Sequence, residues 1–196
     1  MGFLLMGALF IVLPRTMVSA KRINQVLDLH SSIQNLAQVQ LADENLKGQV
    51  EFKDVTFRYA ANSEAVIENV SFRAEAGQTV AFIGSTGSGK STLVNLIPRF
   101  YDVSAGEILV DGVNVQDYAL EDLRNKVGYI PQKAVLFSGD VKDNLDFGQS
   151  QETPLSEQAM WQALELAQSK NFIEDKEAGL ASEVAQGGTN FSGGQR

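Results

Sequence analysis

The spacing of apolar and polar positions changes along the chain, and each spacing predicts a different kind of element. Across residues 18–36, apolar residues recur three and four positions apart, which predicts a helix. Across residues 49–77, apolar and polar residues alternate, which predicts two or more antiparallel strands. Helical spacing returns at 155–168 and predicts a helix within a helical region that reaches Lys176.

A short run of apolar residues at 79–83 interrupts the alternating pattern. Such a continuous run is typical of a strand buried on both faces of a parallel sheet. A glycine-rich turn follows it, and then a helical pattern at 90–100. Residues 106–115 predict a strand and a turn, residues 120–126 a short helix, and residues 127–130 another strand. The order of strand, loop and helix predicts the α/β class.

The first 13 residues are strongly apolar and carry no charge. The run is shorter than the roughly 20 residues that cross a bilayer. Arg15, Lys21 and Arg22 follow the run, which disfavours a signal peptide and, by the positive-inside rule, places the following chain in the cytoplasm. We therefore predict that residues 1–13 are the C-terminal part of a transmembrane helix and residues 14–48 a linker helix and connection. A buried soluble helix and a signal peptide are the open alternatives.

The composition and charge of the chain exclude several classes of function. The formal net charge is −8, which argues against a nucleic-acid partner because such binding needs a clustered basic surface. The chain has no cysteine, which excludes disulfides, thiol catalysis and zinc–thiolate sites. His30 is the only histidine, which excludes histidine metal clusters and Ser/His/Asp triads. Any bound phosphate must therefore be held by local geometry.

Residues 84–92, GSTGSGKST, fit the phosphate-loop pattern G-x-x-x-x-G-K-[ST]. The pattern needs a buried strand before it and a helix after it, so that successive backbone N–H groups surround an anion at the start of the helix. Lys90 would reach the β- and γ-phosphates and Ser91 would coordinate Mg²⁺, whereas a merely flexible loop is the alternative. The candidate nucleotide contacts are Gly84, Ser85, Thr86, Gly87, Ser88, Gly89, Lys90, Ser91 and Thr92.

The ending FSGGQR, at 191–196, resembles the signature sequence of ABC transporter nucleotide-binding domains, usually written LSGGQ, with Phe191 in place of the leucine. Three further stretches match that family in the expected order. Tyr59 in FRYA resembles the aromatic residue that stacks on adenine, and Gln132 in YIPQ resembles the Q-loop glutamine. The stretch SEVAQGG at 182–188 resembles the TEVGERG-like segment of exporters, from which it departs at two positions.

The resemblance implies a role for each of these residues. Tyr59 would stack on adenine, and Gln132 would act in catalysis by joining the region of the Mg²⁺ and the attacking water to the transmembrane part. The signature turn would contact the γ-phosphate of ATP held by an opposite subunit. Two ordinary alternatives stay open, with Tyr59 as a strand aromatic and Gln132 as an exposed loop residue. The residues of the signature turn are Ser192, Gly193, Gly194 and Gln195.

The resemblance also implies the fold and the partners. The fold would be α/β, a partial P-loop NTPase (ABC ATPase) core with an antiparallel β subdomain and an α-helical subdomain, preceded by a truncated transmembrane or linker helix. Residues 49–196 would be the nucleotide-binding domain, truncated after the signature motif. The expected cofactors are ATP and Mg²⁺. The expected partners are the membrane and a second half-transporter, in a head-to-tail homodimer or heterodimer, with no nucleic acid.

The activity of the family is ATP hydrolysis coupled to export at the plasma membrane, with the nucleotide-binding domain on the cytoplasmic side. The Walker B strand, its catalytic glutamate and the switch histidine have no counterpart among the 196 residues, so we expect ATP binding without hydrolysis. The transported substrate is not readable from these residues. A non-catalytic ATP-binding or assembly module, which supplies its signature turn to a partner's ATP site, is the alternative function. A soluble P-loop kinase is disfavoured by the apolar N-terminus and the SGGQ ending.

Overall fold

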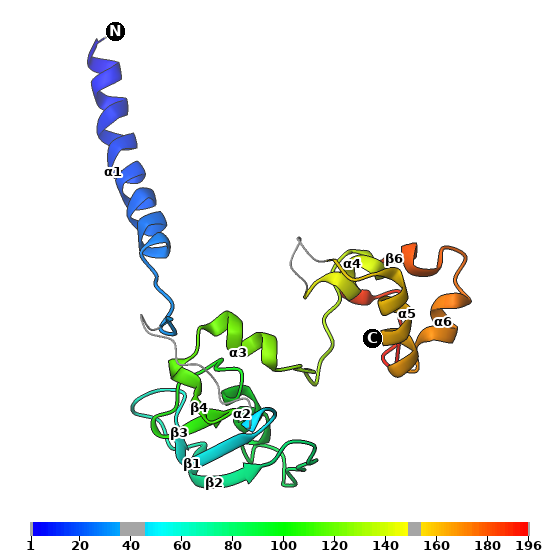
Figure 1. Ribbon diagram of the computed structural model, residues 1–196. Helices are drawn as coiled ribbons and strands as arrows, with labels where there is room; N and C mark the ends of the chain where they lie inside the picture. Colours follow the sequence, from blue (N-terminus) through cyan, green and yellow to red (C-terminus); the bar gives the residue numbers. More distant parts are fainter. Residues whose placement is uncertain (1, 36–45, 149–153, 196) are drawn as a thin grey trace. The chain divides into compact units, whose positions relative to one another are not determined.

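The computed structural model describes residues 2–35, 46–148 and 154–195 (Figure 1). The chain divides into two compact units, Met1–Tyr129 and Ile130–Arg196. The first unit contains a long helix, an antiparallel sheet and two short helices, and the second contains short helices and a two-stranded sheet (Figure 1). The α/β class predicted from the sequence is confirmed.

Helix α1 (Gly2–Leu27) is 26 residues long and continues through Pro14. Proline lacks the N–H of one helical hydrogen bond, and beside it Thr16 Oγ1 donates to the carbonyl oxygen of Val12 at 3.0 Å. In the described part of the chain, no helix combines the length and the apolar character needed to span a bilayer. The transmembrane interpretation of residues 1–13 stays a prediction.

The helix predicted across residues 18–36 ends earlier than its spacing indicates. Residues 28–35 form a turn and irregular chain. Within them the N–H of Ile33 donates to Ser31 Oγ at 3.3 Å. Such a local bond to a side chain competes with helical hydrogen bonds in these residues. Leu36, the last position of the predicted helix, lies outside the described residues.

An antiparallel sheet of four strands forms the first unit, namely β1 (Val50–Phe57), β2 (Ile67–Ala74), β3 (Ala105–Val110) and β4 (Val113–Asn114). The strand order is β2-β1-β3-β4, so β1 pairs on both sides. Phe52 on β1 lies opposite Phe72 of β2 and Ile108 of β3. The antiparallel pair predicted across residues 49–77 is therefore confirmed.

The pairing of β1 with β3 contains an irregularity between Lys53 and Thr56. Asp54 has a φ of 48° there, and Gly106 on β3 has a φ of 79°. A side chain at Gly106 would collide with the carbonyl oxygens of Lys53 and Asp54. The close approach of the two strands at this bulge therefore requires glycine.

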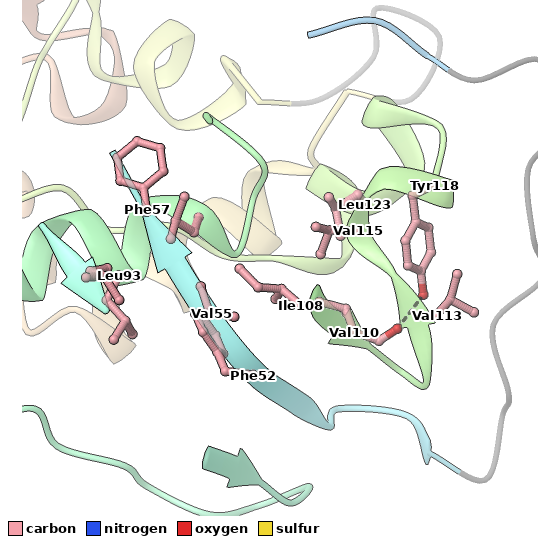
Figure 2. Packing of buried hydrophobic residues seen from close by; sticks show 12 residues of the cluster. Phe52, Val55, Phe57, Leu93, Ile108, Val110, Val113, Val115, Tyr118 and Leu123 are labelled. Carbon is pink, nitrogen blue, oxygen red and sulfur yellow. Dashed lines mark hydrogen bonds between the residues drawn. The ribbon is translucent and has the colours of Figure 1, made fainter. Parts of the chain in front are cut away.

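The hydrophobic core of the first unit gathers around β1 (Figure 2). Phe52, Val55 and Phe57 are 1%, 0% and 2% exposed, so each contributes close to a full side-chain burial, about 1.5–3 kcal/mol. Phe52 also stacks on Phe72, with ring centroids 4.5 Å apart. Two helices complete the cluster, α2 (Lys90–Leu96) through Leu93 and Leu96, and α3 (Leu120–Lys126) through Leu123. Both helices were predicted.

Tyr118 connects this core to β3. The residue follows the 3₁₀ helix η2 (Val115–Asp117) and is 2% exposed. Its hydroxyl donates to the carbonyl oxygen of Val110 at 2.9 Å, which is the dashed line of Figure 2. Burial of the phenol disfavours the phenolate and raises the pKa of Tyr118.

Two predicted strands, at 79–83 and 127–130, do not form. Both stretches are irregular, and Ile83 and Ile130 are 96% and 94% exposed. A strand of a parallel sheet needs neighbours that satisfy its backbone N–H and C=O groups. Among the described residues no strand pairs with either stretch. An apolar run alone therefore creates neither the strand nor its burial.

The second unit is mainly helical, as predicted around residues 155–176. Ser156 begins the longest of its helices and accepts a hydrogen bond from the N–H of Ala159 at 3.2 Å. Its strands are β5 (Gly139–Asp140) and β6 (Glu183–Val184), which pair antiparallel. Its helices are α4 (Val141–Asp146), α5 (Glu157–Leu166) and α6 (Lys170–Glu174), with 3₁₀ helices η3 (Gly179–Ala181) and η4 (Gln186–Gly188). The buried core consists of Val141, Met160, Leu164, Ile173, Leu180, Val184 and Phe191.

Candidate functional site

The phosphate loop at 84–92 connects the irregular stretch 79–83 to α2. Gly89 precedes the helix with a φ of 84°, in the left-handed region. A Cβ added at Gly89 would lie 2.9 Å from the carbonyl oxygen of Val66, so this turn requires glycine both for its conformation and for its close contact. Gly87 has a φ of 85°, and an added Cβ there would meet no atom within 4 Å, so the tip of the loop is open.

The ammonium group of Lys90 lies across this loop. Its Nζ donates to the carbonyl oxygens of Gly84 and Ser85 at 2.8 and 2.7 Å, and to Ser88 Oγ at 3.2 Å. A lysine ammonium has three donors, and these three acceptors match them in number. The positive charge is therefore placed over the open loop. There the oxygen atoms of a bound anion could replace these three acceptors of Lys90 Nζ.

Ser91 and Thr92, the next two residues of α2, face different surroundings. Ser91 is exposed, so its hydroxyl can reach a ligand outside the loop. Thr92 is 7% exposed, and its Oγ1 shares a hydrogen bond of 2.8 Å with the hydroxyl of Tyr59. The structure thus brings together Tyr59 and the phosphate loop, two features that the sequence analysis assigned to one nucleotide.

Tyr59 follows the end of β1 and belongs to a group of three aromatic rings. Its ring centroid lies 4.8 Å from that of Phe57 and 5.2 Å from that of Tyr101, with interplanar angles of 83° and 90°. Tyr59 is still 53% exposed, which leaves ring surface for a ligand. The sequence analysis predicted Tyr59 but missed Tyr101.

An open pocket of about 490 Å³ borders the phosphate loop. Its walls include Gly84, Ser88 and Lys90 on the loop, with Ile67 and Glu68 on β2. The volume falls within the range of about 300–1,000 Å³ that small-molecule sites occupy. The first unit therefore offers both a cationic group and space beside it.

The signature turn lies in the second unit. The N–H of Ser192 donates to Gln195 Oε1 at 3.0 Å, and the N–H of Gln195 donates back to the carbonyl oxygen of Ser192 at 3.0 Å. The contact of a glutamine side chain with the N–H three residues earlier is one half of a capping box. Gly193 and Gly194 are exposed, and a Cβ added to either would meet nothing within 4 Å. The turn therefore presents bare backbone to its surroundings.

Phe191 anchors that turn. The residue is 5% exposed and packs against Phe172, with ring centroids 5.9 Å apart. Lys176 Nζ lies over the same ring, 4.6 Å from its centroid. The phenylalanine that replaces the usual leucine is thus accommodated in the core of the second unit.

Gln132 is exposed and lies in an irregular stretch of the second unit. Tyr59 and the phosphate loop belong to the first unit, whereas Gln132 and the signature turn belong to the second. In the part of the chain that the structure describes, no group of three acidic, histidine or cysteine side chains could hold a metal ion. Ser91 and Gln132 stay the candidate Mg²⁺ ligands.

Comparison with known proteins gives consistent matches. The family model for ABC transporters matches residues 67–196. An uncharacterised ABC transporter ATP-binding protein of Mycobacterium tuberculosis is 45% identical over 94% of this chain and 31% of its own length. The ATP-dependent lipid A-core flippase of Pasteurella multocida is 42% identical over 78% of this chain and 26% of its own length.

A solved structure extends the likeness to the fold. The structure of a bacterial Atm1-family ABC exporter with ATP bound superposes with a TM-score of 0.84 at 27% identity, over 97% of this chain and 33% of that one. The chain spans about a third or less of the length of these relatives.

Proposed function

The chain belongs to the ABC transporter family, and we propose that it is the ATP-binding portion of an exporter that couples ATP binding and hydrolysis to transport across a membrane. Its relatives include an ATP-dependent lipid A-core flippase and a putative multidrug export ATP-binding/permease protein of Staphylococcus aureus.

One observation carries the proposal of ATP binding, namely the position of Lys90. The loop places this ammonium over an open backbone turn, and Gly87 and Gly89 keep side chains away from that turn. Phosphate oxygens are strong acceptors for an ammonium and for backbone N–H groups. We assign the phosphates to residues 84–92 and the adenine to Tyr59, whose hydroxyl already contacts Thr92.

Both proposed Mg²⁺ ligands carry a side-chain oxygen of the kind that the ion binds. Ser91 is an exposed hydroxyl one position after Lys90, and Gln132 offers an exposed amide oxygen. Mg²⁺ prefers such oxygen ligands and usually keeps several waters. When bound, the ion neutralises phosphate charge. Ser91 and Gln132 would each supply one oxygen ligand.

The partner that we propose is a second half-transporter. The signature turn exposes the backbone of Gly193 and Gly194, so a phosphate held by another subunit can approach closely. We propose a head-to-tail dimer, homomeric or heteromeric, at a plasma membrane with the ATP-binding portion on the cytoplasmic side. The non-catalytic module is not favoured, because the named relatives are flippases and exporters.

The Lys90 contact gives a direct test with a matched control. Lys90→Ala in the 196-residue chain should weaken ATP binding about tenfold to hundredfold, since it removes a charge-assisted contact worth about 1.5–3 kcal/mol. Lys53→Ala removes the same charge from an exposed ion pair with Glu107, 2.9 Å long, and should leave affinity unchanged. Calorimetric titration measures both, with circular dichroism to check folding.

The same samples test turnover. We propose that these 196 residues bind ATP but release phosphate only at the background rate, because phosphoryl transfer also needs a group that orients water. Equal ATP affinities for the wild type and Lys90→Ala would overturn the phosphate-loop assignment. Robust phosphate release that depends on Lys90 and Mg²⁺ would contradict the proposal of binding without turnover.

A further inference from the structure

Tyr101 lies in the segment between α2 and β3 and touches both aromatic residues at the end of β1. Its ring centroid is 5.2 Å from that of Tyr59 and 5.5 Å from that of Phe57. Phe57 and Tyr59 are also in contact, so all three pairs of rings meet. The two pairs that involve Tyr59 are close to perpendicular, at 83° and 90°, which is a favoured geometry for aromatic contact, whereas the Phe57–Tyr101 pair is tilted at 51°.

Hydrogen bonds hold the chain on both sides of Tyr101. Arg99, which is 4% exposed, donates through Nε to Asp102 Oδ1 at 2.7 Å. Arg99 Nη1 also donates to the carbonyl oxygen of Gln116 at 3.3 Å. The ion pair of Arg99 with Asp102 therefore closes a short turn around Tyr101 and fixes its backbone.

A second attachment joins this segment to β1. The N–H of Ser104 donates to the carbonyl oxygen of Thr56 at 2.9 Å, and the N–H of Arg58 donates to Ser104 Oγ at 3.0 Å. Thr56 and Arg58 flank Phe57, and Arg58 immediately precedes Tyr59. The position of Tyr101 relative to Tyr59 is thus set by backbone contacts and not only by the rings.

Tyr59 is more than half exposed and would otherwise rotate freely. A side chain that is ordered before a ligand arrives avoids the entropy loss of ordering on binding. Thr92 holds the hydroxyl of Tyr59, and Phe57 and Tyr101 restrain its ring. We propose that Tyr101 is a positioning residue of the base site, which holds the Tyr59 ring in the orientation that stacks on the base of a nucleotide. This inference rests on the proposed function.

The neighbouring residue Phe100 provides a matched control. Phe100 is 39% exposed and Tyr101 is 41% exposed, so a change to leucine removes a similarly placed ring from the same turn. The ring of Phe100 instead contacts Tyr129, with centroids 5.3 Å apart, and lies under the guanidinium group of Arg124. Phe100 therefore shares the turn with Tyr101 but not the contact with Tyr59.

The test compares two ligands, ATP and inorganic tripolyphosphate, by titration calorimetry on the full 196-residue chain. Tyr101→Leu should bind ATP about threefold to tenfold more weakly, which corresponds to about 0.7–1.4 kcal/mol, with tripolyphosphate affinity unchanged. Tyr101→Phe keeps the ring and should bind both ligands like the wild type. Phe100→Leu should leave the ratio of the two affinities unchanged. Lys90→Ala should weaken both ligands.

The outcomes separate this inference from the proposed function. Unchanged ATP affinity in Tyr101→Leu, or an equal loss for both ligands, would overturn the positioning role while the Lys90 result still supports ATP binding. The positioning role would also be overturned if Phe100→Leu weakened ATP binding as selectively as Tyr101→Leu does. The turn, and not the contact with Tyr59, would then be responsible. If Lys90→Ala weakens neither ligand, the proposed function fails and the base site with it.

Discussion

β1 and residues 79–83 are both short segments that were predicted as strands and that lead into a predicted nucleotide contact, yet only β1 is a strand. β1 leads to Tyr59 and pairs with β2 and β3, and its apolar side chains are buried. Residues 79–83 lead to the phosphate loop, and Val80, Phe82 and Ile83 are 43%, 37% and 96% exposed. The proposed base contact thus follows a paired strand, whereas the proposed phosphate contact follows an irregular segment.

The phosphate loop is therefore anchored at its C-terminal end, through α2. Leu93 and Leu96 bury α2 in the core around β1, and Thr92 bonds to Tyr59 at 2.8 Å. These contacts attach the end of the loop to the paired strand. The phosphate-loop pattern predicts that the apolar run at 79–83 supports the loop. The comparison shows instead that the geometry of this site depends more on β1 and α2.

The largest expected effect contrasts the stability of the two segments. Phe52→Ala on β1 should lower the free energy of unfolding by about 3–5 kcal/mol, because it leaves a cavity in a buried core and removes the stack with Phe72. Ile83→Ala should change it by about 0.5 kcal/mol or less, because that side chain is exposed. Urea denaturation followed by circular dichroism measures both.

A large loss in Ile83→Ala would break the comparison. It would mean that residues 79–83 are covered in solution, either by pairing within the chain or by association of two chains. Repeating the denaturation at several protein concentrations separates these cases, since association makes the midpoint depend on concentration.

The next effect concerns Tyr59, the proposed base contact that follows the end of β1. Tyr59→Ala should weaken ATP binding about tenfold, since stacking of a base on an aromatic ring contributes about 1–3 kcal/mol. Tyr59→Phe keeps the ring and loses only the hydrogen bond with Thr92, so we expect a loss of about threefold or less. Titration with ATP measures both variants, and a Phe variant as weak as the Ala variant would assign the contact to the hydroxyl.

The elements that could be predicted from the sequence are those whose partners lie close by along the chain. The helix after Ser156 relies on neighbours a few residues away, and β1 pairs with β2, the next strand along the chain. Both predictions are confirmed. The strands expected at 79–83 and 127–130 rely on distant neighbours, and an apolar run carries no information about whether those neighbours pair with it.

Part of the candidate site escaped the sequence analysis for a similar reason. The phosphate-loop pattern is a local sequence and predicts Lys90 directly, but the contact of Tyr101 with Tyr59 depends on how two distant segments meet. The sequence did contain a signal, an arginine and an aspartate at positions 99 and 102 around a pair of aromatic residues. Opposite charges at that spacing can close a turn, and the structure shows that they do.

The smallest effect tests the other edge of the sheet that β1 organises. Tyr118 has a pKa raised by burial, and its hydroxyl donates to the carbonyl oxygen of Val110 on β3. Its ordinary pKa in an unfolded chain is about 10, so above that pH the unfolded state loses the proton while the folded state keeps it. This contribution to stability is therefore fully present below pH 10 and decreases as the pH rises toward the folded pKa.

Tyr118→Phe removes both the hydrogen bond and the titration. We expect a loss of about 0.5–1.5 kcal/mol at neutral pH, from the lost hydrogen bond to Val110, and a smaller further loss than in the wild type above pH 10. Urea midpoints measured for both proteins from pH 7 to 11 give the two slopes. Parallel slopes above pH 10 would show that Tyr118 is accessible to solvent in both states, and this edge of the sheet would then resemble residues 79–83 rather than β1.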